Sequence, residues 1–307
     1  MKKQNKLAPA LIVAAGVLWG LMGIFVRRLN AMGLSSASIS EVRAVSTTVL
    51  MALVLLVTDR QLFRIRLRDL WIFAGGGVLS IVFFNVCYFK AIELMSLSAA
   101  ATLMYTSPAF VLVFSAILFR ERITGRKVVA ILLTFAGSAL VGGVLGGDAN
   151  LTLLGVLCGV GAGVGYALYS IFSRLALLRG YDPRTITFYI FLFAAIGSLA
   201  VADLPEIASV VRAGPARLLF FLLYAAVTTV LPYLFYTMGL EHVDNSRASV
   251  IVAVEPVVAT VVGVLFYHEA LTVPALLGVL LVLAAIVIMS GPLRRGGEDR
   301  KDAGECA

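Results

Sequence analysis

Charged residues, cysteines and histidines are all scarce in this chain of 307 residues. Only 14% of the residues are charged, and there are three cysteines and two histidines. Cys87, Cys158 and Cys306 show neither a plausible disulfide partner nor metal-ligand spacing. The glycine-rich runs lack the strand-to-helix context and the adjacent Lys-Ser/Thr of a phosphate loop. We therefore expect no metal, no cofactor and no nucleotide-driven chemistry.

Long polar stretches are also missing, which leaves no room for a soluble domain. Apolar residues make up 61% of the chain, and the mean hydropathy is +1.00. The apolar runs are hydrophobic all round, and each is long enough to cross a hydrocarbon layer that needs about 20 helical residues. We predict an all-α integral membrane protein with ten transmembrane helices at residues 8–28, 36–57, 70–90, 97–119, 127–145, 151–173, 185–203, 217–239, 247–267 and 273–291.

The formal net charge of +8 could suggest a nucleic-acid partner, but the placement of the charges argues against one. Most of the 25 basic residues fall on one side of the predicted membrane arrangement, together with both termini. This asymmetry is typical of cytoplasmic segments. We expect a multi-pass protein of the plasma membrane with both termini in the cytoplasm, bound by lipid and not by nucleic acid.

The second half of the chain repeats the first. A shift of 148 positions superimposes residues of the same type in nine places: Val82, Tyr88, Glu93, Ser98, Ala100, Pro108, Val113, Glu121 and Thr124 on Val230, Tyr236, Glu241, Ser246, Ala248, Pro256, Val261, Glu269 and Thr272. A shift of 147 superimposes Gly16, Phe25 and Arg27 on Gly163, Phe172 and Arg174, with Trp19 over Tyr166.

Each repeat holds five predicted helices, so the second repeat must enter the membrane from the opposite side. The domains we expect are residues 1–146, residues 147–292 and a polar cytoplasmic tail at 293–307. Inverted repeats are typical of secondary transporters, whose substrate site lies near the midplane between the repeats.

Two aligned stretches carry a family resemblance. The first reads Ser98-Ala-Ala-Ala-Thr, then Ser107-Pro108 and Glu121-Arg-Ile-Thr124, and the second reads Ser246-Arg-Ala-Ser, then Glu255-Pro256 and Glu269-Ala-Leu-Thr272. They resemble the EamA-type modules of the drug/metabolite transporter superfamily, as do Trp19-Gly20 and Arg43, although Tyr166 replaces the tryptophan in the second copy.

The resemblance implies a ten-helix carrier that exports amino acids, other metabolites or drugs. We therefore expect a small-molecule substrate, a proton or a counter-solute as coupling partner, and a monomeric unit. The alternatives from other classes are a membrane scaffold or receptor and an integral-membrane enzyme acting on lipid. Lipid enzymes generally gather His, Asp or Ser at the membrane surface, whereas His242 and His268 fall on opposite predicted sides.

Glu255 is the sharpest single candidate because it lies near the middle of a predicted span. A charged side chain there costs about 2.5–3.5 kcal/mol on insertion scales, so it usually faces a partner or a water-filled cavity. Glu255 either contacts a substrate amine or carries a coupling proton; alternatively, it forms a structural pair with an arginine or stays protonated between helices.

Two prolines and an arginine give further candidates. Pro108 and Pro256 should break their helices near the midplane and free the carbonyls of Met104 and Val252, either as ligand sites or as plain kinks. Arg43 could hold a carboxylate in a bidentate fork, or it could pair with Glu41, Glu255 or a carbonyl.

Aromatic or polar-tipped groups within the spans suit a mostly apolar pocket with a few oriented polar contacts. Ordinary packing is the alternative for each of them. The candidates are Trp19, Asn85, Tyr88, Tyr105, Ser107, Tyr166, Tyr233 and Tyr236. Glu121 and Glu269 end equivalent helices on opposite sides of the membrane, where each carboxylate should cap the next helix or serve as a gate.

Overall fold

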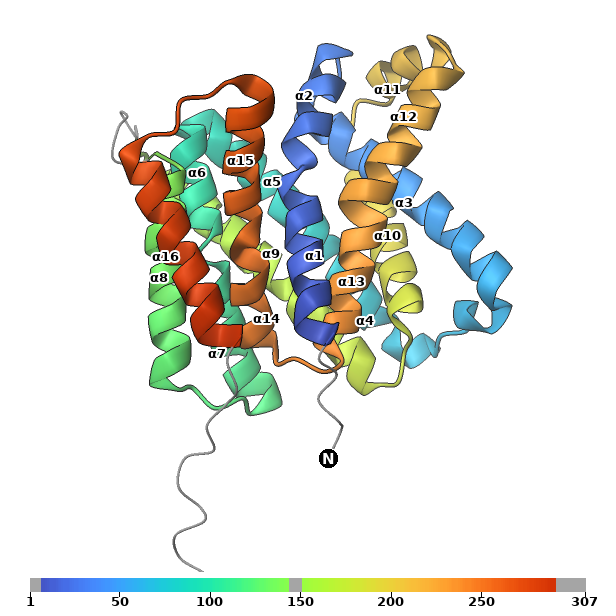
Figure 1. The fold of residues 1–307 in the computed structure, drawn as a ribbon. Coiled ribbons are helices and arrows are strands. Elements are labelled where there is room, and N and C mark those ends of the chain that lie inside the picture. Colours follow the sequence, from blue (N-terminus) through green and yellow to red (C-terminus); the bar gives the residue numbers. More distant parts are fainter. Residues whose placement is uncertain (1–6, 144–150, 291–307) are drawn as a thin grey trace, which may run out of the picture.

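The computed structural model describes residues 7–143 and 151–290, and these residues form helices without any strand. The helices stand side by side in one bundle (Figure 1). The boundaries expected at 146/147 and the tail at 293–307 lie outside the described residues.

The first repeat contains the helical segments of the first half of the chain. They are α1 (Leu7–Gly20), α2 (Met22–Ala31), α3 (Ser36–Thr58), α4 (Leu70–Ala74), η3 (Gly75–Val82), α5 (Phe83–Leu94), α6 (Leu97–Met104), α7 (Ser107–Phe119) and α8 (Gly125–Val141), with short 3-10 turns at Arg60–Phe63 and Leu67–Asp69.

The second repeat follows the same plan, with one additional short helix. Its segments are α9 (Leu153–Leu178), α10 (Pro183–Ser198), α11 (Leu204–Arg212), α12 (Pro215–Ala225), η5 (Ala226–Val230), α13 (Leu231–Leu240), α14 (Asn245–Ile251), η6 (Val252–Val254), α15 (Glu255–Tyr267) and α16 (Val273–Ser290).

Each of the ten predicted spans corresponds to a helix or to a continuous series of helical segments, so the predicted all-α membrane fold is confirmed. Eight of these stretches are long and apolar enough to cross a membrane. The two others are α8, with 17 residues, and α10, with 16. The span predicted at 185–203 ends earlier, at Ser198, because the chain turns there and starts α11 at Leu204. Helix α11 was not predicted from the sequence, although Asp203 caps it and Pro205 occupies its first turn.

The two repeats point in opposite directions. We call the end of the bundle where α1 begins and where the α7–α8 turn (residues 120–124) lies the lower end. The end that carries the α15–α16 turn (residues 268–272) is the upper end (Figure 1). Since these two turns are equivalent in the repeat but lie at opposite ends, the second repeat is inverted.

The equivalent turns have the same backbone geometry. Arg120 and His268 are the two non-glycine residues with positive φ in the described part of the chain, at 56° and 55°. The amides of Glu121 and Glu269 donate to the carbonyls of Ser115 and Gly263, at 3.2 and 3.1 Å. The left-handed conformation ends α7 and α15 in the same way. The two repeats therefore share the backbone structure of this turn as well as its sequence.

The helices that enter the core also share a local distortion. The π-helical segments η3 and η5 end at Val82 and Val230, which are equivalent positions in the two repeats. π-Helical turns inside α-helices often occur at functional sites. Both segments lead directly into the helices, α5 and α13, that carry the central aromatic residues.

Candidate functional site

Glu255 lies where the chain changes from α14 through the 3-10 turn η6 into α15. It is the first residue of α15 and is followed by Pro256, whose missing N–H suits the first turn of a helix. The hydroxyl of Tyr166, from α9, donates to the Glu255 carboxylate at 3.2 Å. The structure thus brings two residues of the predicted set into direct contact.

Aromatic side chains surround this pair from both repeats. The Trp19 ring, from α1, lies 6.4 Å from Tyr166, 5.0 Å from Tyr233 and 5.7 Å from Tyr236 in centroid distance. The cavity between them has a volume of only about 20 Å³. Because one water needs about 10–15 Å³, this aromatic box is closed to a solute in the described conformation.

Two further tyrosines of the predicted set, Tyr88 of α5 and Tyr105 after α6, lie outside the aromatic box. Tyr88 stacks on Phe84 at 5.6 Å, and Phe84 meets the edge of Tyr166 at 5.8 Å. Tyr105 ends α6, and the buried Ser107 begins α7. Ser107 occupies the position in the first repeat that Glu255 occupies in the second, so only the second repeat places a carboxylate at the break.

Pro108 and Pro256 both stand in the first turn of a new helical segment. The freed carbonyls, however, lie against neighbouring helices. A Cβ added at Gly16 of α1 would lie 2.6 Å from the Val252 oxygen, and one at Gly163 of α9 would lie 3.3 Å from the Met104 oxygen. Glycine is required at Gly16 because this close crossing has no space for a side chain.

Arg43 is buried in α3, with 6% of its surface exposed. Its Nη1 approaches the Met22 sulfur at 3.9 Å, and its Nε has no hydrogen-bond partner within the described residues. Glu41, one of the alternative partners considered for Arg43, instead accepts a hydrogen bond from Ser198. A pairing with Glu255 is likewise absent from the described contacts. Among residues 7–143 and 151–290, Arg43 is therefore a buried cation without a carboxylate partner.

The lower end is closed by Glu121. Its carboxylate accepts from the Asn245 amide at 2.9 Å, from the Ser246 amide at 3.4 Å and from the Ser246 hydroxyl. Lys127 pairs with it at 3.2 Å, and the two side chains are only 9% and 7% exposed. We expected Glu121 to cap the next helix, α8, but the amides it caps belong to α14 of the other repeat.

The lower end has a second contact between the repeats. Asp69, at the start of α4, is fully buried and accepts from Arg179 and, at 2.8 Å, from the Tyr181 hydroxyl. Burial raises the pKa of the Tyr181 phenol. Asp69 and Glu121 thus each fasten one repeat to the other at this end.

The upper end lacks the equivalent closure. Glu269 is 54% exposed and pairs at 2.7 Å with Arg27, whose guanidinium lies 3.8 Å from the centre of the Tyr267 ring. By the repeat, the partners that correspond to Asn245 and Ser246 are Leu97 and Ser98, at the start of α6. Among the described residues, α6 is instead capped by Ser96, whose hydroxyl oxygen accepts a hydrogen bond from the Ala99 amide.

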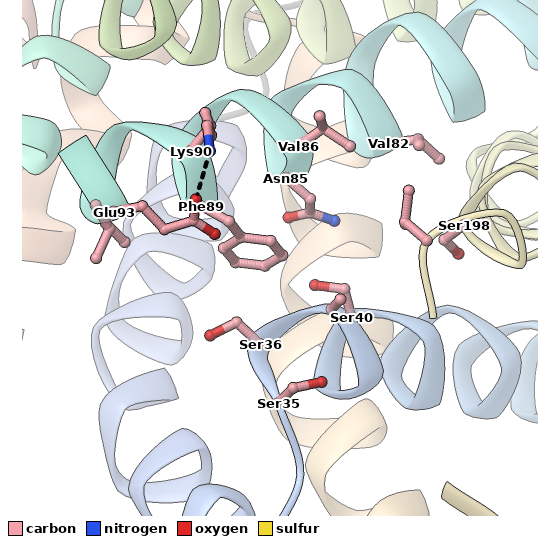
Figure 2. Close-up of a pocket in the computed structure, with 13 residues that line it drawn as sticks. Ser35, Ser36, Ser40, Val82, Asn85, Val86, Phe89, Lys90, Glu93 and Ser198 are labelled. Carbon is pink, nitrogen blue, oxygen red and sulfur yellow. Dashed lines mark hydrogen bonds and ion pairs between the residues drawn. The ribbon is translucent and has the colours of Figure 1, made fainter. Parts of the chain in front are cut away.

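Asn85 does not join the aromatic box. It lines a separate cavity of about 510 Å³ at the upper end, between α3, α5 and the end of α10 (Figure 2). Ser40, Phe89 and Ser198 line the same cavity and were not predicted as site residues. Asn245 and Ser246 were also not predicted as the partners of Glu121. No cluster of three metal-ligating side chains occurs among residues 7–143 and 151–290.

Comparisons with known proteins agree with this architecture. The model of the EamA-like transporter family matches residues 6–143 and again residues 153–291. Two proteins of Archaeoglobus fulgidus, both described as uncharacterized transporters, are similar. One is 30% identical over 66% of this chain and 70% of its own length, and the other is 29% identical over 88% and 94%.

A relative in Bacillus subtilis, the uncharacterized transporter YxxF, is 23% identical over 93% of this chain and 90% of its own. One solved crystal structure superimposes with a TM-score of 0.75 over 92% of this chain and 95% of that chain. Its sequence identity is 17%, so this likeness concerns the fold alone.

Proposed function

Because this chain belongs to the EamA-like transporter family, we propose that it is a secondary active transporter that exports small amphipathic metabolites. Amino acids and related compounds are the substrate class we favour, and alternating access between the two inverted repeats is the mechanism. The family and the membrane-spanning helices establish a transporter; substrate, direction and mechanism are our proposal.

The proposal rests on one observation: the glutamates of the two equivalent turns differ in their burial and in the partners that they contact. Glu121 is buried on the start of α14, whereas Glu269 is exposed and bound to Arg27. Inverted repeats that adopt different states place the access path at one end at a time. The described conformation supports a state that is closed at the lower end, with a cavity at the upper end.

The central residues suggest how a substrate would be held. Glu255 can bind a substrate ammonium group or carry the coupling proton, and the buried guanidinium of Arg43 can take a carboxylate in a fork. The rings of Trp19, Tyr166 and Tyr233 offer apolar surface between them. A substrate with an apolar body and both charges would use all of these groups, once the box opens.

The distribution of the basic residues supports the orientation that we propose. Those at the lower end include Arg60, Arg64, Arg66, Arg68, Arg120, Arg122, Arg126, Lys127, Arg174, Arg179, Arg184 and Arg247; those at the upper end are Arg27, Arg28, Lys90, Arg212 and Arg217. Cytoplasmic segments hold the excess of basic residues, so we assign the lower end to the cytoplasm of a plasma-membrane protein. We propose a monomeric transporter. Its transport is driven by a proton gradient or by exchange for a counter-solute.

The first test is metabolite profiling of the medium around cells that make the wild type or Glu255→Gln at matched levels. We expect a compound enriched outside only with the wild type, and its movement in liposomes that contain only this protein. Glu255→Gln keeps the size of the side chain but removes its charge. Equal transport and equal pH dependence in both proteins would remove Glu255 from the path, and a lack of any transported solute would contradict the function.

A further inference from the structure

The cavity at the upper end is lined by residues that the transport proposal leaves without a role. Its volume of about 510 Å³ lies within the usual range of small-molecule sites, about 300–1,000 Å³. The lining comes from the first turns of α3, one face of α5 and the end of α10: Ser35, Ser36, Ala37, Ser40, Val82, Asn85, Val86, Phe89, Lys90, Ile92, Glu93, Ser198 and Val201.

Two polar groups in the wall lack hydrogen-bond partners. Asn85 and Ser40 are each 8% exposed, and the described residues provide no hydrogen bond to either side chain. In Figure 2, the Asn85 carboxamide points from α5 into the gap that faces Ser40 of α3. Neither side chain is among the fully buried polar groups without a partner, so both face the open cavity and are free to bond to a polar occupant.

The rest of the wall is apolar and electrically balanced. Val82, Val86 and the Phe89 ring present apolar surface beside Asn85. Lys90 and Glu93 form an ion pair of 2.7 Å, with side chains 51% and 63% exposed. The lining therefore carries no unpaired charge, and an ion with net charge would enter without a counter-charge.

The cavity is separate from the aromatic box. Ile81 and Phe84 face the box, whereas Val82, Asn85 and Val86 face the cavity, so this stretch of the chain forms a wall between them. Arg43 lies three residues beyond Ser40 in α3, which is about 4.5 Å further into the membrane at 1.5 Å per residue. A solute in the cavity would thus lie next to the path toward the central residues.

We propose that this cavity is a second solute site that takes a net-neutral amphipathic molecule, with a hydrogen-bonding end on Asn85 and Ser40 and an apolar body on Val86 and Phe89. The assignment rests on the proposed transport function. In that function, the cavity is a binding site at the open end of the transport path. A zwitterionic amino acid with an aliphatic side chain has the chemistry required, because its two charges cancel.

The site can be tested without measuring transport. In nanodiscs, a protein that carries Ser36→Cys, with alanine at the three native cysteines, is labelled by a membrane-impermeant maleimide. The probes are L-leucine, isoamylamine and 4-methylpentanoate, which share one apolar body but are net neutral, positive and negative. We expect only leucine to slow the labelling, and to do so saturably. Equal protection by all three, or by none, overturns the proposal.

Variants at Asn85 separate binding from folding. Asn85→Ala removes one hydrogen-bonding group, so the leucine concentration for half protection should rise about fivefold. Asn85→Asp adds a negative charge and should shift the preference from leucine to isoamylamine. Thr48→Ala on the same α3 is the matched control, since Thr48 bonds only its own helix at Ala44. A preference unchanged in Asn85→Asp contradicts the site.

The two proposals fail in different ways. If leucine protects Ser36→Cys but no amino acid crosses proteoliposomes, the transport function is wrong for this class while the binding site holds. If amino acids are transported and Glu255→Gln stops them, but Asn85→Ala binds and transports as the wild type, the second site is wrong. Labelling that responds only to the lipid composition of the nanodisc identifies a lipid crevice and also overturns it.

Discussion

The two ends of the bundle are built from the same turn, but only one of them is fastened. Arg120 and His268 adopt the same left-handed conformation, and the glutamate that follows each has the same backbone hydrogen bond. Even so, the Glu121 side chain is 9% exposed and caps α14, while that of Glu269 is 54% exposed and holds Arg27. Local sequence therefore sets the shape of the turn, and the packing of the repeats decides what its carboxylate contacts.

The largest effect should follow from removing the buried carboxylate at the lower end. Glu121→Ala leaves Lys127 buried without a counter-charge and the start of α14 uncapped. Breaking a buried pair in this way costs about 3–5 kcal/mol. Thermal unfolding in detergent should show a clear loss of stability, and a cysteine placed at Ser246 should become reactive from the lower end.

The matched control is Glu269→Ala, the same change at the equivalent position of the open end. An exposed ion pair contributes less than about 1 kcal/mol, so this variant should unfold close to the wild type. Similar losses in Glu121→Ala and Glu269→Ala would mean that the two ends are equally fastened.

A mid-sized effect is expected where α1 crosses the break between α14 and α15. Gly16→Ala would place a methyl group 2.6 Å from the Val252 oxygen, a backbone atom that cannot turn aside. Overpacking of this kind typically costs about 1–3 kcal/mol. Gly23→Ala, where no atom lies within 4 Å of the added carbon, is the control. Unfolding midpoints in detergent should fall for Gly16→Ala alone; helix propensity favours alanine over glycine, so a fall in both would contradict the close contact at Gly16 as the cause.

The smallest effect concerns the cation at the open end. Arg27→Ala removes an exposed pair and its stacking on Tyr267, for a loss of less than about 1 kcal/mol. Because exposed pairs are screened by salt, the difference from the wild type should shrink further in high salt. A large, salt-independent loss in the unfolding curve would show that the upper end is fastened as firmly as the lower one.

The helices, the inverted repeat and the family could be predicted from the sequence, because the length of the apolar runs and the repeated residues can be read directly along the chain. The partners of Glu121 could not be predicted, since Asn245 lies 124 residues away and meets it only when the bundle closes. The π-helical turns are likewise invisible in composition.

Two features of the site follow from helix spacing alone. Glu41 and Arg43 are two residues apart in a helix and so cannot face each other, which already argued against their pairing. Asn85 follows Phe84 in α5, and adjacent residues of a helix point in different directions, so Phe84 lines the aromatic box and Asn85 lines the upper cavity. The start of α11 could also be predicted from the sequence, since Asp203 and Pro205 are ordinary helix-start signals.

The central claim is that the two equivalent turns exchange states, so that closure at one end accompanies opening at the other. Double electron–electron resonance in nanodiscs tests it most directly, with spin labels at Arg122 and His242 for the lower end and at Leu97 and Ala270 for the upper end, in a protein without native cysteines. When transported solute or a pH step is applied, the account predicts that the lower distance lengthens as the upper distance shortens. Distances that stay fixed at both ends, or that change in the same direction, would contradict it.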